Sequence, residues 1–210
     1  MPSSRDKVFI VSGRDRTAYE AVSELLVALG VEPVSWKEAT AVAKKNNPTF
    51  GQILDTGFKL SSAVIVLLTP DEHAVLRTEL RKPTDGGDRN KTGPVGQPRP
   101  NVLYELGYAM RASRNKTIVV LFGGCRVPSD MYGLHTIEHN PLNIDHTVED
   151  IGVALKRAGV RLDDVPRAEL LRRCERLRTL GTSQIEPGDY VRAGTAVRSV
   201  ASSTGYATKS

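Results

Sequence analysis

The sequence predicts one α/β domain, built on a mainly parallel sheet that helices cover on both faces. Short apolar runs alternate along the chain with segments of helical periodicity, a pattern that requires crossover connections between parallel strands. The apolar runs are continuous rather than alternating between apolar and polar residues, as expected of strands buried on both faces. At 210 residues the chain is long enough for one good core and too short for two ordinary domains.

Each expected element has its own signal. The first strand is rich in β-branched residues and ends at Gly13, and the helix after it keeps an apolar spacing of three and four residues up to Gly30. The third strand is a run of apolar residues that Pro70 closes. We expect strands at Lys7–Ser12, Val31–Trp36, Ala63–Thr69, Thr117–Phe122 and about Leu134–His139, and helices at Thr17–Leu29, Phe50–Leu60, Asn101–Ser113 and Val148–Ala158.

This alternating pattern defines a domain over residues 5–160, and the rest of the chain differs from it in composition. Residues 161–180 are basic and place Leu170 and Leu177 on one face, which predicts an amphipathic helix that docks on the domain or on a partner. Residues 181–210 are rich in Gly, Ser and Thr and poor in apolar residues, so we expect a flexible tail.

The composition argues against several partners and locations. The net charge is +5, but residues 156–178 alone hold eight Lys or Arg and four Asp or Glu, with almost no aromatic side chains among them. A surface that stacks nucleic-acid bases is therefore not expected. No apolar run approaches the roughly 18 residues that span a bilayer, and the N-terminus lacks a signal-peptide pattern, so we expect a cytoplasmic protein. Cys125 and Cys174 are expected to stay unpaired there.

Ligands of open parallel sheets bind beyond the carboxyl ends of the strands, where the strand order reverses. The turn Ser12-Gly13-Arg14-Asp15-Arg16 follows the first strand and opens a helix. Its backbone N–H groups can hold a phosphate, and Arg14 or Arg16 can add a bidentate contact. The alternative is an ordinary exposed turn, because the dinucleotide-binding and Walker glycine patterns are both missing.

A second candidate group lies on the helix after Pro100. Asn101 is expected to cap this helix, which puts Glu105 near the first turn, where the positive helix end keeps a carboxylate ionised near neutral pH. Just upstream, Arg81–Pro100 is rich in Gly and Pro with Val95 as its one apolar residue, which predicts a long mobile loop. The alternative for Glu105 is a solvated helix surface. Two faces are expected: a buried one with Leu103, Leu106 and Met110, and one toward the strand ends or water with Glu105, Tyr108 and Ala112.

The run His135-Thr136-Ile137-Glu138-His139 matches a zinc signature that needs both histidines on one helix face. Its β-branched residues and the Asn140-Pro141 that follows predict an extended segment instead. That conformation separates the two histidines by roughly 13 Å, too far to share an ion. We therefore expect no metal at this run.

Five stretches of the chain, taken together, resemble the bacterial TIR-like predicted nucleotide-binding proteins, which include the TIR effectors of cyclic-nucleotide anti-phage systems. Their order and spacing match over roughly residues 5–160, and the Asn-Val-Leu-Tyr-Glu-Leu-Gly-Tyr stretch is the specific part. The five are KVFIVSGRD at 7–15, LGVEPVSW at 29–36, AVIVLLTPDE at 63–72, RPNVLYELGYAM at 99–110 and VPSDMYGL at 127–134.

The resemblance implies a flavodoxin-like sheet of order 2-1-3-4-5 and hydrolysis of NAD at its nicotinamide–ribose bond. Glu105 matches the catalytic glutamate of the motif. NAD is then the substrate rather than a cofactor. The nucleotide-binding positions that it implies are Ser12, Arg14 and Asp15 in the first loop, Trp36 at the end of the second strand and Asp71 after the third. To these we add Gly13 of the same glycine turn and Tyr108, which lies beside Glu105 on the helix.

Three functions remain open from the sequence. The first is an NAD glycohydrolase effector, for which one carboxylate suffices because the nicotinamide of NAD is already a cationic leaving group. The second is an enzyme like the nucleoside deoxyribosyltransferases, which also use a helix glutamate against a ribosyl carbon. The third is a non-enzymatic TIR scaffold or nucleotide-binding module. The expected partners are a cyclic-nucleotide-linked activator or sensor protein and, in the active state, further copies of the same chain.

Overall fold

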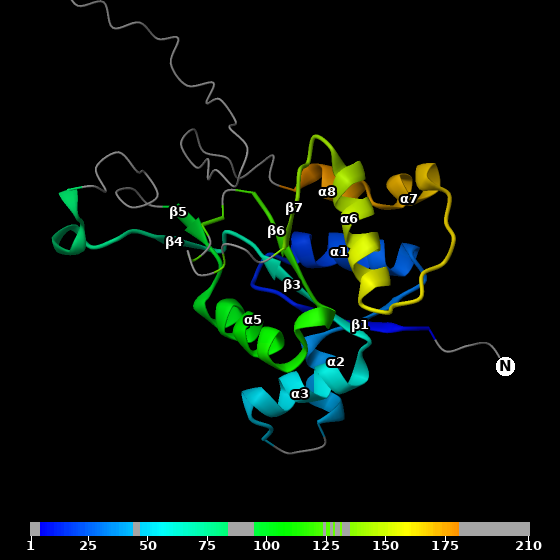
Figure 1. Ribbon diagram of the computed structural model, residues 1–210, viewed down its shortest axis with the longest axis horizontal. Coiled ribbons are helices and arrows are strands. Elements are labelled where there is room, and N and C mark those ends of the chain that lie inside the picture. Colours follow the sequence, from blue (N-terminus) through cyan, green and yellow to red (C-terminus); the bar gives the residue numbers. More distant parts are fainter. Residues whose placement is uncertain are drawn as a thin grey trace, which may run out of the picture.

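The computed structural model describes residues 5–43, 47–83, 95–123, 125–126, 128, 131 and 135–180. Helices and strands alternate through these ranges as predicted (Figure 1). The strands are β1 (Lys7–Val11), β2 (Glu32–Val34), β3 (Ala63–Leu68), β4 (Glu72–Ala74), β5 (Val95–Gln97), β6 (Thr117–Leu121) and β7 (Thr136–Glu138). The helices are α1 (Arg16–Ala28), α2 (Trp36–Val42), α3 (Phe50–Leu60), α5 (Pro100–Ser113), α6 (Ile144–Arg157), α7 (Arg167–Arg173) and α8 (Glu175–Thr179), with short 3₁₀ turns at Thr78–Leu80 and Arg114–Lys116.

Five strands form one parallel sheet in the order β2-β1-β3-β6-β7. Counted along the chain within this sheet, that is the order 2-1-3-4-5, so the predicted fold class and topology are confirmed. Phe9 of β1 lies opposite Val34 of β2 and Val64 of β3. The chain moves outward from β1 to β2 and then crosses back to β3, so the strand order reverses beside β1.

Helices cover both faces of this sheet and bury two apolar cores (Figure 1). Alternate residues of β3 face opposite sides: Ile65 lies in the core beneath α1, α6, α7 and α8, and Val66 in the core beneath α2, α3 and α5. All six residues of β3 are buried, which is why this strand has no polar alternation. Each fully buried Ile or Leu of this kind stabilises the fold by about 1.5–3 kcal/mol.

The second strand is shorter than predicted, because a helix starts where the strand was expected to continue. Ser35 caps α2 by accepting a hydrogen bond from the Glu38 N–H at 3.2 Å, while the Glu38 carboxylate accepts one from the Ser35 N–H at 2.6 Å. This capping box favours the helical conformation from Trp36 onward. Trp36 is therefore the first residue of α2, and its predicted place at the end of a strand is wrong.

The segment Arg81–Pro100, predicted as one long loop, contains a strand. β5 pairs antiparallel with β4 and buries Val95, the apolar residue of the segment. Arg99, two residues after β5, donates a hydrogen bond to Glu72 of β4 at 3.2 Å. The loop prediction is therefore wrong for β5, and its central part, residues 84–94, lies outside the described residues.

The basic segment near the C-terminus folds onto the sheet domain as two short helices rather than one. α7 and α8 meet at Cys174, and both pack against α1 (Figure 1). Leu170, Cys174, Leu177 and Leu180 are buried in the same core as α1, as the predicted apolar face requires. The predicted tail, residues 181–210, lies outside the described residues.

Candidate active site

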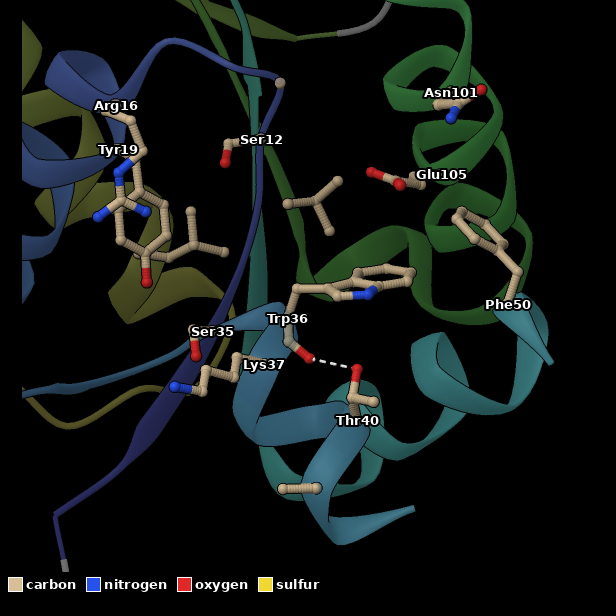
Figure 2. A pocket seen from close by; sticks show the side chains of 14 residues that line it. Ser12, Arg16, Tyr19, Ser35, Trp36, Lys37, Thr40, Phe50, Asn101 and Glu105 are labelled. Carbon is tan, nitrogen blue, oxygen red and sulfur yellow. Dashed lines mark hydrogen bonds between the residues drawn. The ribbon is translucent and has the colours of Figure 1, made fainter. Parts of the chain in front are cut away.

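A cavity of about 940 Å³ lies at the carboxyl ends of β1 and β2, beside the point where the strand order reverses. This size is within the range of small-molecule and cofactor sites. Its walls come from the β1–α1 loop, the first turn of α1, and helices α2, α3 and α5 (Figure 2). The lining residues include Gly13 and the side chains of Ser12, Arg16, Tyr19, Ser35, Trp36, Lys37, Phe50, Asn101 and Glu105.

Glu105 points from α5 into this cavity, on the side away from α1 (Figure 2). Its side chain is buried, with 8% of the residue exposed, and it shares the buried row of α5 with Val102, Leu106 and Ala109. Among the described residues no group hydrogen-bonds to its carboxylate or forms an ion pair with it. Burying a polar side chain without a hydrogen-bond partner costs free energy, so a ligand that supplies a partner would be bound favourably. The carboxyl group of Glu105 is available for such a contact.

Burial raises the pKa of Glu105 to about 7, against the smaller opposing effect of the Arg99 guanidinium. The expectation that this carboxylate stays ionised near neutral pH is therefore wrong for the unliganded protein. Desolvation outweighs any help from the helix dipole, because the dipole acts mainly on the first turn. At pH 7 the protonated and ionised forms are about equally populated.

The helix itself begins earlier than predicted. Arg99, not Asn101, occupies the N-cap position, and Pro100 is the first helical residue. Proline suits this position because its fixed φ matches the helix and its missing N–H would have no partner there. Glu105 is consequently in the second turn, and Asn101 lines the cavity one turn before it.

The predicted faces of α5 are also partly wrong. Leu106 is buried and Ala112 is exposed to water, as predicted, but Leu103 and Met110 are only half-buried. The buried row instead contains Val102 and Glu105. The helix α5 is therefore rotated about its own axis compared with the orientation that its apolar residues alone predict.

Aromatic rings form the part of the cavity wall that lies next to Glu105. The Trp36 and Phe50 ring centroids are 5.0 Å apart, and Phe9 lies 6.3 Å behind Trp36 in the core. Phe50 in turn contacts Tyr104 of α5, with centroids 5.6 Å apart. Such pairs hold their rings rigidly and give a flat apolar surface for a planar ligand group. Phe50 was not among the predicted site residues; only the helix prediction that starts there points to it.

The end of the cavity opposite Glu105 is positively charged. Arg16 and Lys37 line it, and the Arg16 guanidinium lies 5.2 Å from the centre of the Tyr19 ring (Figure 2). Lys37 has no ion-pair partner among the residues that the structure describes. Sequence reasoning named Arg16 as a phosphate contact and missed Lys37. The signal that could have found Lys37 is the Ser35–Glu38 capping box, which places it in the first turn of a helix at the strand ends.

The loop after β1 is tied to the loop after β3 through Asp71. The Arg14 backbone N–H donates to Asp71 Oδ2 at 2.6 Å, and the Thr69 hydroxyl donates to Oδ1 at 2.7 Å. Gly13 leaves the space for this carboxylate: a Cβ there would lie 2.8 Å from Cγ of Asp71 and closer still to Oδ2. Asp71 does not line the cavity; its contacts shape the loop that does.

Gly13→Ala is therefore expected to displace Asp71, cost both hydrogen bonds, and lower the free energy of unfolding by about 1–3 kcal/mol. Gly107→Ala is the matched control, since an added Cβ on that exposed residue of α5 meets no atom within 4 Å. The control is expected to gain about 0.5–1 kcal/mol from reduced backbone entropy. Urea unfolding measures both, and a Gly13→Ala variant as stable as the wild type would contradict the close approach of Asp71.

Three other predicted site residues lie outside the cavity wall. Asp15 caps α1 by accepting a hydrogen bond from the Ala18 N–H at 3.0 Å. The guanidinium of Arg14 is exposed. Tyr108 donates to Asp55 of α3 at 2.8 Å, so it joins α5 to α3 below the site. These three positions support the loop and helices that carry the wall residues.

The histidines of the zinc-like run flank β7 and do not meet. His139 is buried, with its Nδ1 3.3 Å from the Thr147 hydroxyl and its ring against Phe122, whereas His135 is exposed. Across the described ranges, no three His, Cys, Asp or Glu side chains lie close enough to hold a metal ion together. Cys125 and Cys174 are both buried free thiols.

Comparison with known proteins places this site in a family. The sequence matches the family model of the TIR domain of the CAP12/Pycsar effector protein over residues 7–141, well over half of the chain. The chain belongs to this TIR-domain family. The matched range contains every side chain that lines the cavity, whereas α6, α7 and α8 lie beyond it.

Two curated relatives match part of the chain. The chain is 32% identical over 142 residues to the uncharacterized protein YuaY of Escherichia coli (strain K12), which is 63% of this chain and 39% of that protein. It is 26% identical over 138 residues to protein tirC of Dictyostelium discoideum, which is 62% of this chain and 63% of that protein. The chain thus spans less than two thirds of either relative. In the described part of the TIR protein, no helix combines the length and the apolar composition needed to cross a bilayer.

Proposed function

We propose that this TIR domain hydrolyses NAD at the nicotinamide–ribose bond, as an effector of anti-phage defence in the cytoplasm. The observation that carries the proposal is the buried carboxyl group of Glu105, which has no partner among the described residues and faces a cavity of dinucleotide size. Membership of the CAP12/Pycsar effector family supports a cyclic-nucleotide-linked activator, and we propose that the active state is a homo-oligomer.

The chemistry needs little more than this carboxylate. The bond between the nicotinamide nitrogen and ribose C1′ breaks, and its electron pair leaves with nicotinamide, which becomes neutral. Positive charge then develops on the ribose, where an ionised Glu105 in a site of low dielectric stabilises it. Water adds to C1′ and releases a proton to the Glu105 carboxylate or to solvent, which leaves ADP-ribose.

The remaining wall residues supply binding. Trp36 and Phe50 present flat surfaces beside Glu105 for the nicotinamide ring. The first loop, through Ser12 and Gly13, and the positive end, through Arg16, suit the phosphates. Arg14, Asp15, Asp71 and Tyr108 are proposed to act by holding these elements in place rather than by touching the nicotinamide.

The direct test is nicotinamide release from NAD by the purified full chain at low and high protein concentration. Chromatography measures the nicotinamide that is released. Release that rises more steeply than protein concentration supports an oligomeric glycohydrolase. Protein that binds ADP-ribose but never releases nicotinamide, with or without cyclic nucleotides, would point to the scaffold function. Transfer of the ribosyl group to an added nucleobase would point to the deoxyribosyltransferase-like reaction.

The pH profile provides a further prediction. Because the catalytic form is the ionised one and the pKa of Glu105 in the free protein is about 7, kcat/KM should rise about tenfold per pH unit below that value and level off above it. The cationic nicotinamide of bound NAD favours the carboxylate, so the rise in kcat should occur at lower pH. Initial rates between pH 5.5 and 8.5 measure both, and a flat kcat/KM over this range would contradict the role of Glu105.

A further inference from the structure

The C-terminal helices contact the element that carries the positive end of the cavity. α8 packs on α1, with Leu177 of α8 in the same buried core as Leu25 of α1 (Figure 1). The first turn of α1 supplies Arg16 and Tyr19 to the cavity wall. A segment beyond the matched TIR range is therefore in direct contact with a helix of the site.

The polar contact between these helices centres on Glu20. Its Oε2 is 2.7 Å from Arg176 Nη1 of α8, whereas its Oε1 is 3.5 Å from Arg16 Nη2. Arg176 also binds Glu24, one turn further along α1, with Nε 2.6 Å from Oε1. A single carboxylate thus lies between the arginine of α8 and the arginine of the cavity, and the arginine of α8 holds it more closely.

An anion bound in the cavity would compete with Glu20 for Arg16. The guanidinium of Arg16 lies over the Tyr19 ring, which keeps it at the cavity. A tighter Arg16–Glu20 pair would neutralise the positive charge of the guanidinium and move the guanidinium along α1, away from the cavity. By occupying the Glu20 carboxylate, Arg176 weakens that pair.

We propose that Arg176 is a positioning residue: by holding Glu20 it keeps the Arg16–Glu20 pair weak, so that Arg16 can bind the phosphate groups of a nucleotide in the cavity. The inference rests on the nucleotide site of the proposed function and does not depend on cleavage. It gives the α7–α8 segment a role in ligand affinity, so that a partner or ligand that moves α8 would change the affinity of the site.

The proposal predicts opposite effects for two substitutions that break the same contact. Arg176→Ala releases Glu20 to Arg16 and should weaken ADP-ribose binding, whereas Glu20→Gln frees Arg16 and should strengthen it. Exposed ion pairs of this kind change affinities by about two- to fivefold. If the contact served only to dock α8, both substitutions would change affinity in the same direction.

The test is calorimetric titration of the full chain with ADP-ribose in low-salt buffer, where exposed ion pairs are least screened. The double variant Arg176→Ala/Glu20→Gln should bind as Glu20→Gln does, because Arg176 acts through Glu20. The matched control is Arg178→Ala, which removes an equal charge from the same helix but pairs with Glu175 and not with α1. Its affinity should equal that of the wild type.

Several outcomes would overturn the proposal: equal loss in Arg176→Ala and Arg178→Ala, additive effects in the double variant, weaker binding by Glu20→Gln, or no ADP-ribose binding by the wild type. Glu20→Gln decides the question by itself if Arg176→Ala fails to fold. Failure of the proposed function is distinct, since it appears as missing nicotinamide release in protein that still binds ADP-ribose.

Discussion

Glu105→Gln is expected to slow NAD cleavage by about 100- to 1000-fold, the usual effect of removing one preorganised electrostatic contact to a transition state. Glutamine keeps the size and hydrogen-bonding capacity of the side chain but cannot carry the negative charge. The loss should appear in kcat, and nucleotide affinity should change little, because the contacts of Trp36 and Arg16 act on the ground state as well. Nicotinamide release and ADP-ribose titration measure the two quantities separately.

The matched control is Glu32→Gln. Glu32 is exposed at the amino end of β2, away from the carboxyl ends that border the cavity, and it pairs with Lys7 at 2.6 Å. Its substitution therefore removes one carboxylate without touching the cavity. Cleavage by this variant should equal that of the wild type. If Glu105→Gln cleaves NAD as fast as the control under conditions where the wild type is active, the catalytic assignment is wrong.

The same Glu105→Gln substitution is expected to stabilise the folded protein in a pH-dependent way. The pKa of Glu105 is about 7 in the folded protein and has its usual value of 4.5 in the unfolded chain. Between these values the folded state binds more protons, so the free energy of unfolding of the wild type falls as pH rises from 4.5 to 7. Above pH 7 the deficit is constant at about 3 kcal/mol, the product of the pKa difference and the free energy per pKa unit.

Glutamine has no charge to bury, so the variant avoids this cost. Urea unfolding should give nearly equal free energies for variant and wild type at pH 4, and a variant more stable by about 3 kcal/mol at pH 8.5. A difference that does not depend on pH would mean that the Glu105 carboxyl group is not desolvated. A site that gives up stability to keep an ionisable group buried is the usual pattern for function.

Local sequence signals were sufficient for most of the fold. The apolar run of β3 and the spacing along α1 each specify an element without reference to the rest of the chain, and crossover chirality then leaves few topologies. The elements that the sequence did not predict are short. β5 has three residues, and pairing with β4 stabilises it, which no local pattern in a Gly- and Pro-rich segment reveals. α2 was missed although the Ser35–Glu38 capping box marks it.

The site was predictable in part for the same reason. Ser12, Gly13, Trp36 and Glu105 line the cavity, and each belongs to a stretch that follows a strand or starts a helix at the expected edge. Asp71 was chosen by the same rule and Tyr108 as a neighbour of Glu105, yet Asp71 accepts a hydrogen bond from the Arg14 N–H and Tyr108 donates one to Asp55. Whether such a residue faces a ligand or a neighbour depends on side-chain direction, which its position in the chain does not specify.

The sequence by itself predicted the parallel α/β class and the strand-end edge for a ligand, from periodicity and chain direction, and its family resemblance predicted the strand order and Glu105 as the candidate catalytic carboxylate. Only the tertiary structure decided that Glu105 is buried and that its pKa is raised to about 7, since burial depends on how α5 packs against the sheet. It also decided that Arg176 reaches Glu20 across 156 positions of sequence. Burial and long-range charge pairs arise from packing, and packing is a property of the whole chain.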